Sequence, residues 1–228
     1  MSPARRMASL TSQLNQLEKR HGRQRPTWPT GPYEFLLWWH SGYPASDARC
    51  SRGWAALNDF TSLEPKRLVA CKVLALTRVL KAGGLIPDLR AQRIKAIAQR
   101  VLDEFDGDLS ATLARLRPEQ VRKALKGFPG MGDPGAERIM LFAGIAPIAA
   151  IPSNATQVAV RLQCGGSLGG YAKDYRQGAD LVESATPATL AARQRAYLLL
   201  KVHGETLCTR SKPACADCPV AAGCAYPT

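Results

Sequence analysis

Apolar residues recur three or four positions apart along most of this 228-residue chain, the spacing of helices that bury one face. Leu10, Leu14 and Leu17 predict a short helix that ends before Pro26. Segments 62–84 and 93–107 predict two longer helices, and the first of these closes at a pair of glycines. No alternation of apolar and polar residues is long enough for a strand. The pattern therefore predicts an all-α protein.

The pattern changes after residue 146. An apolar stretch breaks at Pro152 and is expected to resume as a helix capped by Ser153 or Asn154. A glycine-rich stretch over 165–170 separates this helix from a later one, which is expected to end at Gly204. This change predicts a second lobe in the C-terminal third of the chain.

The charge of the chain indicates its class of partner. Lys and Arg number 31 against 18 Asp and Glu, a formal net charge of +13. Such a surplus favours a polyanion, because neutralising phosphates releases condensed counterions, although a merely basic surface is the alternative. No apolar run is long enough for a membrane helix, and the N-terminus lacks the apolar core of a secretory signal. We therefore expect a cytoplasmic protein, associated with the nucleoid, that has no membrane partner.

Four of the seven cysteines crowd into the last stretch of the chain: Cys208, Cys215, Cys218 and Cys224. Four clustered thiolates can enclose a metal centre, and such sites are usually zinc or iron–sulfur, a choice that the number of thiolates leaves open. Two disulfides are disfavoured in a reducing compartment. The isolated Cys50, Cys71 and Cys164 are expected to be small buried hydrophobes.

A glycine-rich turn joins two predicted helices over Lys126–Gly132. Gly130 and Gly132 allow a tight turn that leaves backbone N–H groups uncovered beside a helix N-terminus, which suits a phosphate oxygen. Met131 lies between the two glycines and Lys126 adds a cation at the edge. The turn therefore indicates a DNA contact that is blind to sequence, and a plain helix–turn–helix connection is the alternative.

The cysteine spacing (x6, x2, x5) resembles the [4Fe–4S] loop of the endonuclease III family of helix-hairpin-helix DNA glycosylases. The resemblance includes His203-Gly204 before the first cysteine and the Leu-x-Gly-Phe-Pro-Gly-Met-Gly turn. It implies a [4Fe–4S] cluster, with zinc as the alternative, and double-stranded DNA as partner. Arg210 and Lys212, between the first two cysteines, would then meet phosphate or simply solvate the loop.

The resemblance runs from about residue 32 to the end of the sequence and implies a two-lobed fold. Before it, residues 1–31 are expected to form a basic N-terminal arm that packs with the cluster domain. Residues 32–146 form a helical barrel with the helix-hairpin-helix at about 120–143. Residues 147–228 form the iron–sulfur domain, with the cysteine loop at 208–224. Members of the family flip a base out of the duplex.

The sequence departs from the family at both catalytic positions. Pro134 stands where the family has a lysine nucleophile, and Pro152 falls at the aspartate position, or Ser153 or Asn154 if the alignment shifts. Proline has no free amine to form a Schiff base. Asp133, Glu137 and Asp174 are candidate stand-ins, with helix capping and dipole interactions as their alternative roles.

A further candidate for DNA contact follows the first barrel helix. Tyr43 or His40 could wedge into the stack that a flipped base leaves, whereas Trp38 and Trp39 are expected in the core. The resemblance to the endonuclease III family implies a monomeric DNA N-glycosylase of base excision repair that acts on damaged or distorted duplexes, and Pro134 implies that it lacks a lysine-dependent lyase step. A non-catalytic damage-binding protein and a zinc-stapled structural protein are the alternatives.

Overall fold

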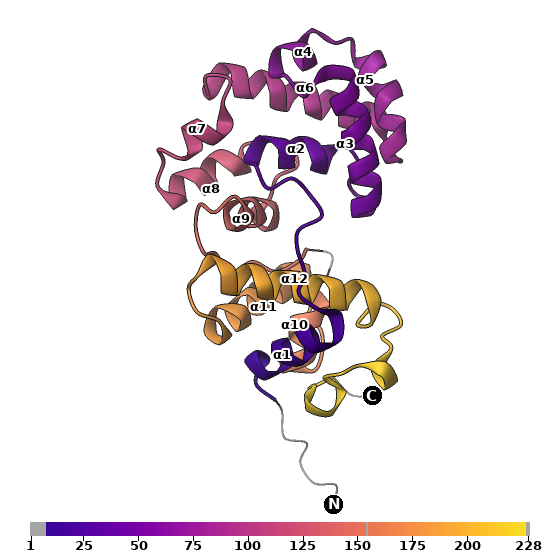
Figure 1. Cartoon of the computed structure of the whole chain (residues 1–228), viewed down its shortest axis with the longest axis vertical. Coiled ribbons are helices and arrows are strands. Elements are labelled where there is room, and N and C mark those ends of the chain that lie inside the picture. Colours follow the sequence, from indigo (N-terminus) through magenta and orange to yellow (C-terminus); the bar gives the residue numbers. More distant parts are fainter. Residues whose placement is uncertain (1–7, 154, 227–228) are drawn as a thin grey trace, which may run out of the picture. The chain divides into compact units, whose positions relative to one another are not determined.

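Short helices follow one another throughout the computed structural model, which describes residues 8–153 and 155–226 (Figure 1). No strand occurs within these residues, so the all-α prediction is confirmed. None of the helices in the described part of the chain is both long and apolar enough to cross a membrane. Asn154 and the first part of the N-terminal arm, residues 1–7, lie outside the described residues.

The chain forms two compact units. One is Pro26–Gly132, and the other combines the segment up to Arg25 with the chain from Asp133 onward. The sequence analysis placed the boundary between the two lobes at residues 146/147 instead. The difference arises because helix α9 (Asp133–Phe142) packs on α12 (Leu190–Thr206) through the rings of Phe142 and Tyr197, whose centroids are 5.1 Å apart.

The unit Pro26–Gly132 consists of helices that mostly begin at proline. A proline occupies the first turn of four of its helices, where the missing N–H costs no helical hydrogen bond. Its elements are α2 (Pro32–His40), α3 (Asp47–Thr61), α4 (Pro65–Ala70), α5 (Val73–Leu80), η1 (Lys81–Gly83), α6 (Pro87–Glu104), α7 (Leu109–Leu113) and α8 (Pro118–Lys126).

The single helix predicted over 62–84 is wrong. The structure breaks it at Cys71, whose backbone is extended, so α4 and α5 are separate helices. Lys95 of α6 donates hydrogen bonds to the carbonyl oxygens of Val69 and Cys71, which satisfies the exposed end of α4. Val73, at the start of α5, is exposed.

The other unit surrounds a continuous apolar core. Leu10, Leu14 and Leu17 of the N-terminal helix α1 are buried in this core, where α1 contacts α11 and α12. Val220, between the third and fourth clustered cysteines, belongs to the same core. The elements of this unit are α1 (Leu10–His21), α9, α10 (Thr156–Cys164), α11 (Tyr171–Ala185), α12, η2 (Cys215–Asp217) and η3 (Ala221–Gly223).

Two predicted helix ends in this unit are wrong. The N-cap of α10 is Ala155, which has no capping side chain, rather than Ser153. Helix α12 continues past Gly204 to Thr206. Gly204 instead permits close packing, because a Cβ there would lie 2.6 Å from the Cβ of Ala155 and 2.9 Å from a methyl of Val158.

Candidate functional site

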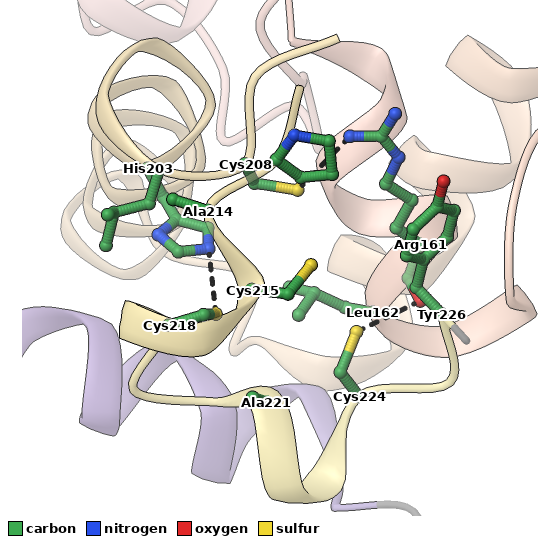
Figure 2. A pocket seen from close by; sticks show the side chains of 12 residues that line it. Arg161, Leu162, His203, Cys208, Ala214, Cys215, Cys218, Ala221, Cys224 and Tyr226 are labelled. Atoms are coloured by element: carbon green, nitrogen blue, oxygen red, sulfur yellow. Dashed lines mark hydrogen bonds between the residues drawn. The ribbon is translucent and has the colours of Figure 1, made fainter. Parts of the chain in front are cut away.

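The four clustered cysteines line one pocket at the end of α12 (Figure 2). Cys208 follows α12 directly, Cys215 begins η2, Cys218 ends it, and Cys224 follows η3. The two short 3-10 turns thus bring cysteines that are far apart along the loop to one place. All four are partly buried and none is in a disulfide.

Two nitrogen-bearing side chains meet sulfur at the edge of this pocket. Arg161 of α10 donates to Cys208 Sγ at 3.6 Å, and His203 Nε2 lies 3.6 Å from Cys218 Sγ (Figure 2). Burial raises the pKa of the Cys208 and Cys218 thiols, although Arg161 opposes the effect at Cys208. Thiolates in this pocket therefore require a nearby positive charge, which a metal centre supplies.

The donor set has the chemistry of a metal site. Within residues 8–153 and 155–226, no three His, Cys, Asp or Glu side chains converge closely enough to hold one metal ion as they stand. The four thiols line one pocket, and four thiolates are ligands for either zinc or an iron–sulfur cluster.

The remaining cysteines differ in burial. Cys50 is buried as expected, whereas Cys71 is partly exposed and Cys164 is exposed, so the prediction that all three are buried is wrong for two of them. Cys71 lies in the break between α4 and α5, and Cys164 ends α10, where neither side chain faces a core. Arg210 and Lys212 are exposed in the loop between the first two clustered cysteines.

The predicted hairpin turn lies between α8, which ends at Lys126, and α9, which begins at Asp133. Gly130 has φ +65, a conformation that side chains with a Cβ rarely adopt, and both it and Gly132 are exposed. Phe128 is buried against Phe105, and Met131 is buried as well. The side chain of Met131 therefore supports the turn, and its backbone N–H donates to the carbonyl oxygen of Phe128 at 3.1 Å.

Residues from elsewhere in the same unit support the turn. His40 Nε2 is 2.9 Å from the carbonyl oxygen of Pro129, a hydrogen bond that a neutral imidazole donates. Burial, and then the charge of Arg93, lower the pKa of His40 to about 4. The Arg93 guanidinium lies 3.3 Å from the position of a Cβ on Gly130. Sequence reasoning missed Arg93, because nothing in its neighbourhood along the chain marks it; the structure places its cation beside the glycine turn.

The depressed pKa of His40 makes stability depend on pH. Above pH 6.5 His40 is neutral in both the folded and the unfolded state. Between pH 6.5 and about pH 4, His40 is protonated in the unfolded chain but stays neutral in the folded one. We expect the wild-type free energy of unfolding to fall relative to His40→Gln by at most about 3 kcal/mol between pH 6.5 and 4, as measured by urea unfolding. Parallel curves for the two proteins would contradict a buried neutral His40.

Two exposed loops lie near the end of α2. Tyr43 is 46% exposed and stacks on Trp39, with ring centroids 4.2 Å apart. Leu85 and Ile86, 65% and 49% exposed, follow the glycine pair after η1, and Ile86 has φ +47, which is strained for a β-branched residue. The buried Arg90 joins the loops by donating to the carbonyl oxygens of Ser41, Leu80, Gly84 and Leu85. Sequence reasoning missed Leu85 and Ile86, although two apolar residues between Gly84 and Pro87 were a usable signal.

The candidate catalytic positions are dispersed. Pro134 lies in the first turn of α9 and Pro152 is buried before α10. Asp133 is partly exposed at the start of α9. Glu137 is buried and accepts a hydrogen bond from Tyr175 at 2.5 Å. Asp174 is buried, and its two oxygens accept 2.7 Å hydrogen bonds from the Ser167 hydroxyl and the Leu168 N–H.

The overall structure is similar to solved DNA glycosylases. An endonuclease III trapped in a covalent intermediate with DNA has a TM-score of 0.74 and 18% identity, covering 93% of this chain and 92% of that one. The chain has the endonuclease III fold. A thermostable thymine-DNA glycosylase gives a TM-score of 0.68 at 19% identity, covering 93% and 94% of the two chains. The H. pylori 3-methyladenine DNA glycosylase bound to 1,N6-ethenoadenine gives 0.63 at 15% identity, covering 87% and 95%.

No protein-family model matches the sequence, and no curated protein sequence matches it. The endonuclease III fold is thus recognised through structure, at identities too low to carry over an activity. It confirms the predicted helix-hairpin-helix glycosylase fold. Function must be argued from the residues of this chain.

Proposed function

We propose that this protein is a DNA-repair protein that binds damaged or distorted duplex DNA and acts in base excision repair as a DNA N-glycosylase without a lysine-dependent lyase step. The observation that carries the proposal is the glycine turn at Gly130, which is exposed and has the Arg93 cation beside it. The exposed backbone of a glycine turn together with a guanidinium suits a phosphate of DNA. Structures of this fold include complexes with DNA.

Exposed apolar side chains of the same unit support a role on distorted DNA. Proteins that open a duplex often insert apolar wedges between base steps. Tyr43 and Leu85 stand on loops that Arg90 holds together, so we propose them as the wedge residues. Lys126, Arg210 and Lys212 are exposed cations that would add phosphate contacts.

We further propose that Cys208, Cys215, Cys218 and Cys224 hold a [4Fe–4S] cluster. The cysteine spacing, the single shared pocket and the Arg161 N–H that donates to Cys208 Sγ support this assignment. When bound, the cluster would supply a structural staple for the C-terminal loop. The chain presents the four thiols, and Arg210 and Lys212 lie on the loop between the first two of them.

A second function, damage recognition without catalysis, is favoured by the two prolines. Pro134 supplies no amine and Pro152 supplies no carboxylate. Glu137 and Asp174 each hold their neighbours in place through short hydrogen bonds, which is a structural role. A glycosylase without the lysine still needs water to attack the sugar, with a carboxylate to assist.

A strand-cleavage assay on duplexes that each carry one lesion separates the two functions. We expect at least one lesion to give strand breaks only after alkali, because an abasic site would form without lyase cleavage. Borohydride should trap no covalent adduct. Asp133→Asn, Glu137→Gln and Asp174→Asn would then be compared, and the carboxylate that matters is the one whose loss abolishes cleavage while duplex binding persists.

Lesion-preferring binding with no break before or after alkali would instead establish the damage-recognition function. Equal, weak binding to every duplex, together with no cleavage, would contradict both.

A further inference from the structure

A polar pocket of about 390 Å³ lies between α10, α11 and the cysteine loop. No cysteine lines this pocket, which distinguishes it from the cysteine pocket, although Arg161 and Tyr226 line both. Its volume is in the range of small-molecule sites, about 300–1,000 Å³. Its lining residues are Thr156, Gln157, Arg161, Ser167, Gly170, Tyr171, Asp174, Arg210 and Tyr226.

The electrostatics of this pocket favour an anion. The first turns of α10 and α11 both contribute to its wall, through Thr156 and Gln157 and through Tyr171, so two positive helix ends meet there. Arg161 donates to the carbonyl oxygens of Thr209 at 2.7 Å and Arg210 at 2.6 Å. These bonds hold the backbone of Arg210, whose side chain is exposed at the pocket.

The Asp174 carboxylate in the pocket wall does not by itself cancel the positive potential of the two helix ends. Both oxygens of Asp174 accept hydrogen bonds from Ser167 and Leu168, so its charge is directed at the glycine-rich loop. Asp174 thereby holds in place the glycine-rich loop at the rim of the pocket. A Cβ on Gly169 or Gly170 would meet nothing within 4 Å, which leaves the rim backbone open to a ligand.

Gln157 fixes one side of the pocket wall. Its side chain is 8% exposed, and Nε2 donates to the carbonyl oxygen of Cys208 at 3.1 Å. This bond ties the first turn of α10 to the start of the cysteine loop, so the two elements that form this side of the pocket are held together.

Tyr171 supplies an aromatic face. It is 47% exposed at the pocket, and its ring stacks on that of Tyr175, with centroids 6.2 Å apart. Tyr175 is itself held by its hydrogen bond to buried Glu137. The exposed ring is thus backed by a fixed one, an arrangement suited to stacking a planar group.

The geometry points to a pocket for one nucleotide, in which Tyr171 stacks on the base and Arg210 pairs with the phosphate. Only a ligand that combines an anion with a flat ring uses both features. The inference deepens the proposed function, and rests on it only in that a DNA strand would supply the nucleotide. It assigns the cluster-bearing unit a nucleotide contact of its own.

The test titrates the full chain, as purified with its metal centre, with deoxyadenosine 5′-monophosphate, deoxyadenosine and inorganic phosphate. Calorimetry should show the nucleotide binding more tightly than either fragment. Tyr171→Ala should weaken nucleotide binding by at least about five-fold, whereas Tyr171→Phe keeps the ring and the affinity. Arg210→Gln should weaken the nucleotide and phosphate but not the nucleoside.

Arg176→Gln is the matched control, because it removes the same charge from an exposed position on α11 outside this pocket. Unchanged circular dichroism and metal content verify that each variant is folded. Equal affinity for phosphate and nucleotide, no nucleotide binding, or full affinity in Tyr171→Ala would each overturn the inference.

The same preparations keep this inference distinct from the proposed function. If the wild type binds the nucleotide through Tyr171 but binds no duplex, the repair function fails and the pocket stands. If it binds damaged duplexes but not the nucleotide, the pocket fails and the repair function stands. Gly130→Val should leave nucleotide binding unchanged, because the turn does not line the pocket.

Discussion

Cys215→Ala is expected to abolish the brown iron–sulfur absorption and most of the bound iron. The reason is geometric: Cys215 begins the η2 turn and is one of four thiols around one pocket, so its loss leaves an open coordination position. Because burial raises the pKa of Cys208 and Cys218, those thiols without the metal charge revert to neutral groups that bind iron poorly. Visible absorption and iron analysis measure the effect.

Removing the cluster should also weaken duplex binding, since Arg210 and Lys212 lie on the loop that the cluster would close. The matched control is Cys164→Ala, an exposed cysteine outside the pocket, which should retain colour, iron and affinity. An unchanged spectrum and iron content in Cys215→Ala would eliminate the cluster assignment. A colourless wild type that carries zinc would identify the alternative metal.

Gly130→Val should weaken binding to damaged and undamaged duplexes alike, by about ten-fold or more, because a hydrogen bond to a charged phosphate is worth about 1.5–3 kcal/mol. The substitution places a branched side chain at φ +65, with Arg93 at 3.3 Å and the His40 ring at 3.5 Å from its Cβ. It therefore distorts the turn and displaces the neighbouring cation. The logarithmic dependence of affinity on salt should become shallower by about 0.9 for each lost phosphate contact.

Backbone strain must be separated from the loss of the contact. Gly107→Val is suitable because Gly107 has φ +77 in the same unit and a Cβ there would meet only a Leu102 methyl at 3.8 Å. Both variants should lose similar stability in urea, but only Gly130→Val should lose DNA affinity. Full affinity in Gly130→Val would remove the turn from the DNA interface, and parallel losses in both variants would indicate a general folding defect.

Local features of the chain were predictable because neighbouring residues encode them. The spacing of Leu10, Leu14 and Leu17 sets one apolar face, and the structure buries all three in helix α1. Proline favours the first turn of a helix, and Pro32 begins α2. The break at Cys71 was not predictable in this way, because it depends on Lys95, which is 24 residues away along the chain.

The sequence by itself determined the all-α class, the glycine turn over Lys126–Gly132 and the set of four clustered cysteines, since each is written in contiguous residues. Only the tertiary structure decided which side chains serve those features. Arg161 reaches Cys208 across 47 residues, and Arg90 reaches the Ser41 carbonyl across 49. Likewise, Arg93 beside Gly130 and the Tyr171 pocket come from helices packed together. Such contacts depend on how amphipathic faces dock, and residue order along one helix does not specify its partner.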